Sequence, residues 1–530
     1  MVLTLSLPDR FNVADHFILP RLEAGQGEQP YLYCGEDVLS VAGLHARANR
    51  AAHALKHLGT RPGERIALLL RESLDFPACF WGAVRAGAVP VPLNTVLTAE
   101  DYRHYLADSR ARVLICDAAL WPVVSPVLEG LHDLRHVVIT GGAVPGRPTL
   151  AELLGEAPEH FPTRLAHPGD PAFWLYTSGS TGRPKATVHR QRDMVYVVET
   201  YLRQVLRLGP DDLSFSAAKL FFAYGLGNSL YFPLAAGCAG VIQPEPATAR
   251  TCFAVLQRHR PTAFHAVPSV YHAMLRLHEA WSAGREDPPP DLPRLEHLRV
   301  CTSGGEPLPP AVLAGWQAAF GVPILDGIGS TEALHFYVAN QPGQVRPGST
   351  GRVVPGYEVR LAEPAGAEPP PGEAGELWVR GGSIMARYWR QPGRTRHALR
   401  DGWLATGDRF QRDADGWYWY EGRADDLLKV GGSWVNPAEV EQALLTHPAV
   451  AEAAVVGRSM PAGLVQAVAC VVPQPGHEPA AALAEALRAH VAGRLAAFKV
   501  PSRVEFRDDL PRTATGKLRR FLLRQGPDAG

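Results

Sequence analysis

The 530-residue sequence has no excess of either charge, because 53 Lys and Arg residues balance 53 Asp and Glu residues. A balanced chain offers no basic surface for nucleic acid, so we expect no nucleic-acid partner. Lysine itself is scarce: only six basic residues are Lys, at positions 56, 185, 219, 429, 499 and 517. Because a compact ammonium and a planar guanidinium are not interchangeable at a phosphate site, these few lysines are candidates for substrate contacts.

Paired cysteines and long apolar segments are also missing. The seven Cys residues are odd in number and have no CxxC spacing, which argues against a disulfide framework and against a zinc ribbon. No apolar run approaches the roughly 18 residues that span a bilayer, and the N-terminus lacks the basic segment of a signal peptide. We therefore expect reduced thiols, no membrane association and a cytoplasmic location.

The composition, 46% hydrophobic and 20% charged, is that of a globular protein too long for a single hydrophobic core. Between about 60 and 350, helical patterns alternate with short apolar runs that stop at Gly, Ser or Pro, which predicts an α/β layer fold. The expected strands there are 65–70, 112–116, 172–176, 298–301 and 322–325. Alternating strand patterns follow at 375–380 and 416–420, and a compact region with its own helices and strands follows these. We predict a domain boundary near residue 424.

The most informative loop follows the expected strand at 172–176 and reads Tyr176-Thr-Ser-Gly-Ser-Thr-Gly-Arg-Pro-Lys185. Small and hydroxylic residues in a row leave N–H groups and hydroxyls free to surround phosphate oxygens. The loop is not a Walker A motif, because Ala186 follows the lysine where Ser or Thr is required. It is not a GxSxG nucleophile elbow either. An ordinary surface loop is the alternative for this segment taken alone.

Four further segments, in order and at matching spacing, make the whole chain similar to the adenylate-forming superfamily of acyl- and aryl-CoA ligases, luciferases and adenylation domains. The motifs are 177–185 for phosphate, 326–332 for nucleotide, 406–408 for ribose, 422–426 for a hinge and 511–517 for a C-terminal lysine. Within the superfamily, 218–228 and 330–335 resemble the benzoate-CoA ligase branch. The resemblance implies an α/β fold with a large N-terminal adenylate-forming domain of layered sheets and helices, 1–424, and a small mobile α+β domain, 425–530.

The resemblance also assigns a nucleotide site. Its members are Thr177, Ser178, Gly179, Ser180, Thr181, Gly182 and Lys185 on phosphate, Gly305, Glu306, Pro307, Asp326, Gly327 and Ile328 around adenine, and Asp408 and Arg423 on ribose and nucleotide. By the same resemblance Thr331 contacts the α-phosphate, and Glu332 helps to hold Mg²⁺, a hard cation that takes oxygen ligands. A surface ion pair for Glu332 and a plain turn residue for Asp408 are the alternatives.

The chemistry implied has two steps. Lys517 would bridge the carboxylate and the α-phosphate during adenylate formation, as electrostatic stabilisation of the transition state. Rotation about Asp425 would then withdraw Lys517 and bring in Lys429 with Gly431 and Gly432, where missing side chains let the pantetheine of coenzyme A pass close to the backbone. A solvated terminal lysine and a static turn aspartate are the alternatives for Lys517 and Asp425.

For the acid, the resemblance points to Ala223, Tyr224, Gly329, His335 and Phe336. Aromatic and small residues form a flat slot that suits a benzene ring. Core packing is the alternative for the aromatic residues, and a satisfied core histidine is the alternative for His335. Ala333 and Phe336 depart from the Met and Ile usual in the branch, which puts unsubstituted benzoate in doubt and favours a substituted benzoate or another small aryl acid.

These observations predict an ATP- and Mg²⁺-dependent ligase that converts an aromatic acid to aryl-AMP and then to aryl-CoA. A stand-alone adenylation enzyme that loads the pantetheine of a carrier protein is the nearest alternative, and a non-catalytic nucleotide-binding protein is a remote one. Amino acid activation is disfavoured, because such domains place an Asp near 221–224, where this chain has Phe-Phe-Ala-Tyr. We expect a monomer or a homodimer, as in many relatives.

Overall fold

The computed structural model describes residues 2–155, 157–177, 184–287, 293–363, 366–424, 428–430, 433–459, 465–512 and 518–524. These residues form two compact units. The first contains 1–178, 184–359 and 379–404, and the second contains 179–183, 360–378 and 405–530. The boundary near 424 that the sequence suggests adjoins residues outside the described ranges, and it stays a prediction.

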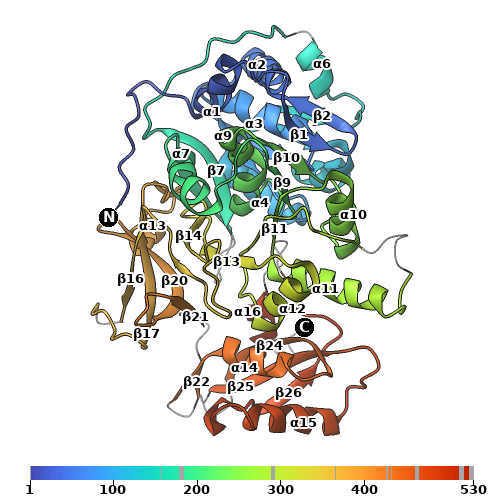
Figure 1. Cartoon of the computed structure of the whole chain (residues 1–530). Helices are drawn as coiled ribbons and strands as arrows, with labels where there is room; N and C mark the ends of the chain where they lie inside the picture. Colours follow the sequence, from blue (N-terminus) through green and yellow to red (C-terminus); the bar gives the residue numbers. More distant parts are fainter. Residues whose placement is uncertain are drawn as a thin grey trace. The chain divides into compact units, whose positions relative to one another are not determined.

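The first unit is built on a large mixed sheet with a parallel centre (Figure 1). Its nine described strands run in the order β15-β14-β13-β12-β11-β9-β10-β1-β2. Their bounds are Arg352–Val353, Phe336–Ala339, Ile324–Gly329, Val300–Ser303, Ala263–Ala266, Leu213–Ser216, Ala239–Ile242, Pro30–Cys34 and Asp37–Ser40. Neighbours from β13 to β1 pair in parallel, whereas β14, β15 and β2 are antiparallel to their partners. The carboxyl ends of the parallel strands therefore share one edge of the sheet.

Two smaller sheets complete the first unit. One is parallel, in the order β4-β3-β5-β6, with bounds Val89–Pro92, Arg65–Leu69, Ala111–Asp117 and His136–Thr140. The other is antiparallel, in the order β18-β8-β7, with bounds Arg387–Tyr388, Lys185–Arg190 and Pro171–Thr177. The apolar runs at 65–70, 112–116 and 172–176 are strands β3, β5 and β7, as expected for strands that are buried on both faces.

Helices flank these sheets. Those of the first unit are α1 Val13–Glu23, α2 Val41–His57, α3 Asp75–Arg85, α4 Ala99–Ser109, α5 Trp121–Val124, α6 Leu150–Gly155, α7 Asp193–Val197, α8 Ala223–Leu226, α9 Phe232–Ala236, α10 Ala249–His259, α11 Pro268–Ser282, α12 Pro310–Phe320 and α13 Pro392–Ala398. Two π-helical segments, η3 Val198–Leu206 and η4 Gly227–Tyr231, continue α7 and α8. Short 3₁₀ turns are η1 Ala118–Leu120 and η2 Ser125–Val127.

The central strands present different chemistry on their two faces. Phe215, Phe264 and Cys301 belong to a buried cluster with Phe253 of α10 and Trp316 of α12, so these helices cover one face. Successive residues of a strand point to opposite faces. The alternate residues Ser214, Ser216, His265 and Thr302 are also buried, and they face away from that cluster. The second face is therefore polar although it is buried.

A five-stranded sheet and a smaller α/β region follow along the chain. Strands β16 Glu358–Ala362, β17 Ala374–Arg380, β20 Trp403–Arg412 and β19 Leu399–Arg400 follow one another in that sheet, and β21 Tyr418–Arg423 pairs with β20. The C-terminal region has the strands β22 Leu428–Val430, β23 Ser433–Val435, β24 Val450–Ser459, β25 Val465–Pro473 and β26 Arg503–Phe506. Its helices are α14 Pro437–Leu445, α15 Ala481–Ala492, η5 Ala497–Lys499 and α16 Arg520–Arg524. A core that includes Val440, Val455, Val471 and Leu487 holds this region together.

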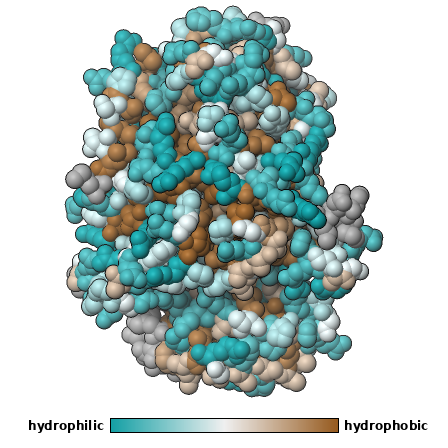
Figure 2. Space-filling model, in the orientation of Figure 1, coloured by the Kyte–Doolittle hydropathy of each residue, from teal (hydrophilic) through white to brown (hydrophobic). Residues whose placement is uncertain are grey.

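The surface is mixed in character. Figure 2 shows hydrophilic side chains spread over the drawn face, with apolar areas between them. Across the described ranges, none of the helices combines the length and the apolar character that crossing a bilayer requires. All seven cysteines are unpaired, and six of them are buried.

Candidate functional site

A polar cluster forms where the phosphate loop rejoins the sheet. Lys185 is the first residue of β8, and the short strand β18 places Tyr388 beside it through pairing with Thr187. The Lys185 Nζ donates a hydrogen bond to Tyr388 Oη at 2.7 Å, and Tyr388 Oη donates to Glu332 Oε1 at 2.6 Å. The Lys185 Nζ and Glu332 Oε1 are 3.6 Å apart. The tyrosine hydroxyl therefore lies between the cation and the carboxylate.

This cluster has groups that phosphate and a hard cation require. A lysine ammonium is a point donor for phosphate oxygens, and a single carboxylate suits Mg²⁺, which takes its other ligands from phosphates and water. Among the described residues no group of three or more His, Cys, Asp or Glu is arranged to hold a metal by itself. The donor set thus fits a cation that arrives with a nucleotide better than a resident structural metal.

The strand that leads into the phosphate loop packs against helix α4. Thr177 ends β7 and is paired with Lys185 across the hairpin. Tyr176 Oη donates to Asp108 Oδ2 at 2.7 Å, and the Tyr176 ring stacks on Tyr105 with centroids 4.3 Å apart. A capping box between Thr98 and Asp101 begins α4, so this helix has a defined start. The loop residues Ser178, Gly179, Ser180, Thr181 and Gly182 lie outside the described residues.

The residues assigned to adenine lie at the carboxyl ends of two adjacent strands. Ser303, the last residue of β12, pairs with Asp326 in β13, and Asp326, Gly327, Ile328 and Gly329 are all in β13. Gly305, Glu306 and Pro307 follow β12, and Gly305 has a φ of +92°, which favours glycine. Crevices at the carboxyl ends of parallel strands are the usual ligand sites of such sheets. Burial raises the pKa of Asp326 well above its ordinary value.

The aromatic residues assigned to the acid lie together. Tyr224 and Phe336 stack with centroids 5.1 Å apart, and His335 lies 5.5 Å from Tyr224. The Phe336 ring also covers bare backbone, because a Cβ at Gly304 or at Gly327 would lie 2.5 or 2.8 Å from it. Gly329 has the same close contact, with a Cβ position 2.5 Å from the carbonyl oxygen of His335. Tyr224 and Phe336 thus pack face to face, and Ala223 precedes Tyr224 at the start of α8.

The polar face of the central sheet supports this cluster, and the sequence motifs did not reveal it. The Thr302 hydroxyl is hydrogen bonded to Tyr224 Oη and, at 2.7 Å, to His265 Nδ1. Burial lowers the pKa of His265 to about 3, so this imidazole is neutral. The only signal in the strand sequences Ala263-Phe-His-Ala266 and Val300-Cys-Thr-Ser303 is the presence of polar residues within short, otherwise apolar runs.

Several buried polar atoms around His335 have no partner within the described ranges. They are both ring nitrogens of His335 and the hydroxyls of Tyr201 and Tyr231. The rings of Tyr201 and His335 are 4.7 Å apart, and a Cβ at Gly227 would lie 3.1 Å from His335 Nε2 and 3.2 Å from Tyr231 Oη. Burial lowers the pKa of His335 well below its ordinary value, which leaves one donor and one acceptor nitrogen. Buried polar groups normally have partners, so this group points to a polar ligand.

Both tyrosines are carried by π-helical segments. Tyr201 belongs to η3 and Tyr231 ends η4. Such i→i+5 turns are rare and are frequently found at functional sites. No periodicity in the sequence distinguishes them from α-helix, which is why Tyr201 and Tyr231 were missed.

In the second unit the structure brings Asp408 and Arg423 together. They are partners on β20 and β21, and Arg423 Nη1 donates to Asp408 Oδ1 at 3.1 Å and to the Thr406 carbonyl at 3.0 Å. Gly407 has a φ of +71°, and a Cβ there would lie 2.7 Å from the guanidinium. The tight Thr-Gly-Asp turn therefore requires glycine. Asp425, Gly431, Gly432, Lys517 and the side chain of Lys429 lie outside the described residues.

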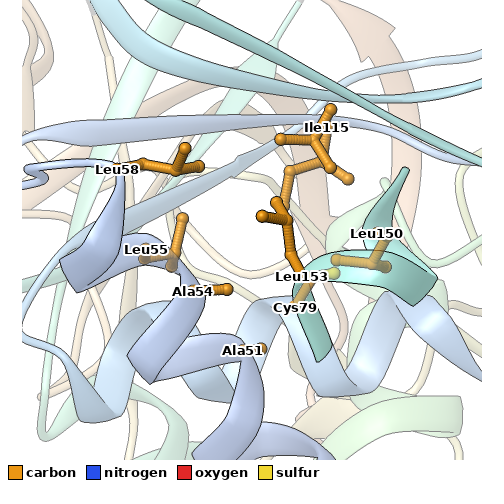
Figure 3. Close-up of a pocket in the computed structure, with 9 residues that line it drawn as sticks. Ala51, Ala54, Leu55, Leu58, Cys79, Ile115, Leu150 and Leu153 are labelled. Atoms are coloured by element: carbon orange, nitrogen blue, oxygen red, sulfur yellow. The ribbon is translucent and has the colours of Figure 1, made fainter. Parts of the chain in front are cut away.

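A small cavity elsewhere has no comparable chemistry. It lies between α2, α3, β5 and α6 and has a volume of about 10 Å³ (Figure 3). Its lining is apolar throughout and includes Leu55, Cys79, Ile115, Leu150 and Leu153. That volume holds about one water-sized probe and no aromatic acid, and no polar group is present to orient a ligand. We interpret it as a packing defect.

Comparison with known proteins identifies the family of this chain. The family model of the AMP-binding enzymes matches residues 21–389, and that of the AMP-binding enzyme C-terminal domain matches residues 439–517. The chain is 44% identical over 524 residues to a benzoate–CoA ligase of Thauera aromatica, covering 98% of this chain and 97% of that protein. It is 40% identical over 516 residues to a 4-hydroxybenzoate–CoA/benzoate–CoA ligase of Rhodopseudomonas palustris, and the match covers 97% of this chain and 94% of that protein.

A solved structure extends the likeness to three dimensions. The crystal structure of an anthranilate CoA ligase in complex with anthranoyl-AMP matches with a TM-score of 0.90 and 36% identity, and the match covers 98% of each chain. The α/β fold class and the resemblance found in the sequence are both confirmed. The chain belongs to the AMP-binding enzyme family.

Proposed function

We propose that this protein activates an aromatic carboxylic acid, benzoate or a substituted benzoate, with ATP and transfers the acyl group to coenzyme A. The products are aryl-CoA, AMP and pyrophosphate. The observation that carries the proposal is the short segment 331–336, which supplies Glu332 to the Lys185–Tyr388 cluster and His335 and Phe336 to the buried aromatic cluster. One short turn thus contributes both to the polar cluster suited to phosphate and to the aromatic cluster suited to the ring of the acid.

In the first step a carboxylate oxygen of the acid attacks the α-phosphorus of ATP, and the bond to pyrophosphate breaks. Lys185 and the backbone of the phosphate loop screen the negative charges, which lets two anions approach. Thr331 holds the α-phosphate, and Asp408 with Arg423 holds the ribose. Mg²⁺, held by Glu332 and the phosphates, would supply further charge neutralisation. Lys517 stabilises the charge that develops on the bridging oxygen.

In the second step the thiol of coenzyme A attacks the acyl carbonyl carbon, and the bond to AMP breaks. We propose that the C-terminal domain turns about Asp425 between the steps, which replaces Lys517 by Lys429, Gly431 and Gly432. Lys517→Ala should then abolish adenylate formation and spare thioester formation from supplied aryl-AMP. Equal loss in both half-reactions would contradict this division of roles.

The polar surroundings of His335 favour a hydroxylated ring. A neutral imidazole offers one donor and one acceptor, and the Tyr231 hydroxyl can serve as either, so a ring hydroxyl can both donate and accept here. A bare benzoate would leave these buried atoms without partners, at a cost of about 1–3 kcal/mol for each unsatisfied group that water does not reach. The R. palustris relative is named for 4-hydroxybenzoate and benzoate together, which is compatible with such a pocket.

The proposal is tested by pyrophosphate release from purified protein with ATP and Mg²⁺. Benzoate, the three hydroxybenzoates, the aminobenzoates, cinnamate and short fatty acids are compared, with and without coenzyme A. Release with an aryl acid, together with CoA-dependent AMP turnover, is expected. Release that coenzyme A does not turn over would indicate a carrier-protein acceptor instead, and the absence of release with every acid would overturn the proposal.

A further inference from the structure

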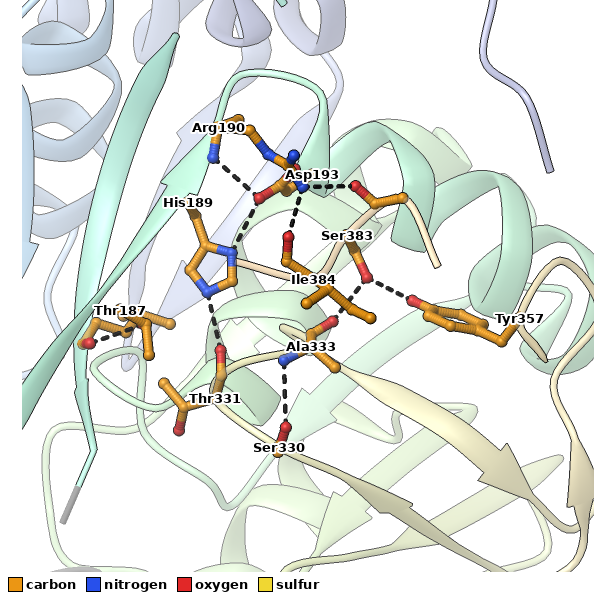
Figure 4. A network of polar contacts seen from close by, with 12 residues as sticks. Thr187, His189, Arg190, Asp193, Ser330, Thr331, Ala333, Tyr357, Ser383 and Ile384 are labelled. Atoms are coloured by element: carbon orange, nitrogen blue, oxygen red, sulfur yellow. Dashed lines mark hydrogen bonds and ion pairs between the residues drawn. The ribbon is translucent and has the colours of Figure 1, made fainter. Parts of the chain in front are cut away.

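Three consecutive carbonyl groups, those of the last two residues of the nucleotide motif and of Ala333, accept or face hydrogen-bond donors from other elements; Figure 4 shows the contacts of Thr331 and Ala333. The Thr331 oxygen is 2.8 Å from His189 Nε2, the Glu332 oxygen accepts from the Met385 amide at 2.7 Å, and the Ala333 oxygen accepts from Ser383 Oγ at 2.8 Å. We call these three contacts the carbonyl clamp. The next residue, Leu334, is buried with a φ of +71°, a conformation that a branched side chain rarely adopts and that its surroundings must hold.

Among the donors of the carbonyl clamp His189 is the ionisable one, and both of its ring nitrogens have polar contacts. Its Nδ1 is 3.1 Å from Asp193 Oδ2. The Asp193 side chain accepts from the Arg190 amide on Oδ2 and from Arg190 Nε on Oδ1, so both of its oxygens act as acceptors. The Thr331 carbonyl is an acceptor only. Both ring nitrogens of His189 therefore face oxygen acceptors, an arrangement that a ring with hydrogen on both nitrogens satisfies.

The surroundings hold this ring rigidly. His189 and Asp193 are fully buried, and Phe173 stacks on the imidazole with centroids 5.1 Å apart and planes inclined by 14°. Arg190 also donates to the Gly382 carbonyl at 3.0 Å, which connects the same carboxylate to the segment that carries Ser383. His189 and Arg190 thus share one carboxylate.

We infer that His189 is a positioning residue for the adenylation step, a role that rests on the proposed function. As a buried imidazolium it fixes the Thr331 carbonyl. The Thr331 and Glu332 side chains are thereby held toward ATP, and a fixed positive charge lies behind the loop that binds the α-phosphate. Preorganised charge of this kind lowers the free energy of a transition state because nothing has to reorient during the reaction.

The kinetic test compares half-reactions in the full-length protein. His189→Gln removes the charge and one of the two ring donors, and we expect kcat/KM for ATP in pyrophosphate exchange to fall about 10- to 100-fold, the range for a hydrogen bond to a charged group. Thioester formation from supplied aryl-AMP should change far less. Asp193→Asn should reproduce this pattern, because the imidazolium loses its counter-charge. An equal loss of activity in both half-reactions would show that His189 has only a structural role, and it would overturn the inference.

A matched control is His53→Gln. His53 also places Nε2 against a main-chain carbonyl, that of His160 at 2.7 Å, but it has no contact with the nucleotide motif. This variant should retain both half-reactions. Any adenylation defect of equal size in His53→Gln would show that the exchange of histidine for glutamine is harmful in general.

A spectroscopic test requires neither a substrate nor an activity measurement. In wild-type protein labelled with ¹⁵N-histidine, one ring should show two protonated nitrogens at neutral pH, and this signal should be absent from His189→Gln. A neutral ring at His189 would overturn the inference. If no aryl acid supports pyrophosphate exchange, the proposed function fails, whereas the NMR result and direct measurement of ATP binding by the same variants still decide the role of His189.

Discussion

Replacing Tyr388 by Phe should make the enzyme require more Mg²⁺. The hydroxyl of Tyr388 lies between Lys185 and Glu332, whose charged atoms are 3.6 Å apart. Without it the ammonium and the carboxylate can close to a direct pair at ~2.8 Å. At an effective dielectric constant of about 20 this approach is worth about 1.3 kcal/mol, which a cation must overcome to bind Glu332. The apparent affinity for Mg²⁺ should therefore fall roughly tenfold.

The assay is pyrophosphate exchange at saturating aryl acid and ATP, with free Mg²⁺ varied. Tyr102→Phe is the matched control, because Tyr102 is buried and donates to the Asn94 carbonyl at 3.0 Å, in contact with the small parallel sheet. It should leave the Mg²⁺ dependence unchanged. A folded Tyr388→Phe enzyme with the wild-type Mg²⁺ requirement would refute the argument that the hydroxyl keeps Lys185 and Glu332 apart.

Three further variants test other parts of the structure. Lys219→Met removes the ion-pair partner of Glu72, a carboxyl group whose pKa is already raised by burial. At neutral pH this substitution should lower the free energy of unfolding, measured in urea, by about 3 kcal/mol. The loss of unfolding free energy should become smaller as pH falls toward the ordinary pKa of Glu, because the unpaired Glu72 carboxyl then takes up a proton. A loss that does not depend on pH would contradict this prediction. Phe336→Ile uncovers space beside two glycines and should raise kcat/KM for bulkier aryl acids relative to benzoate by about tenfold, measured as AMP formation. Arg423→Gln removes the donor to Asp408 and should raise the Kd for ATP about tenfold in calorimetry, whereas an unchanged Kd would remove Arg423 from the nucleotide site.

Strands could be predicted from the sequence where burial of both faces requires a continuous run of apolar residues. Strands β3, β5 and β7 are apolar runs because both of their faces are covered. The runs at 298–301 and 322–325 were displaced by two residues. Leu298 closes a turn with Leu295, so β12 begins at Val300. Strand β13 continues through Asp326-Gly-Ile-Gly329, which no hydrophobic pattern would include.

Candidate site residues could be predicted from the sequence only where they belong to a motif of consecutive residues. Lys185 and Glu332 were found in this way, but Tyr388, which joins them, is 203 residues from Lys185 and belongs to a strand of two residues. His189 and Asp193 had no motif either, since their role depends on a carbonyl group 142 residues away from His189. Contacts made through backbone atoms leave no side-chain pattern at the accepting residue, so sequence reasoning does not detect them.

The π-helical segments that carry Tyr201 and Tyr231 make the shape of the proposed acid site depend on the length of the chain as well as on the identity of its residues. A π turn contains an additional residue relative to an α turn. Deletion of one residue from Val198–Leu206 ahead of Tyr201 would restore α-helical geometry there and change the position of Tyr201 within its turn. The Tyr201 ring would then leave the face of His335. A single-codon deletion is therefore a route to a new range of acids in this fold, and a survey of substitutions alone would not sample it.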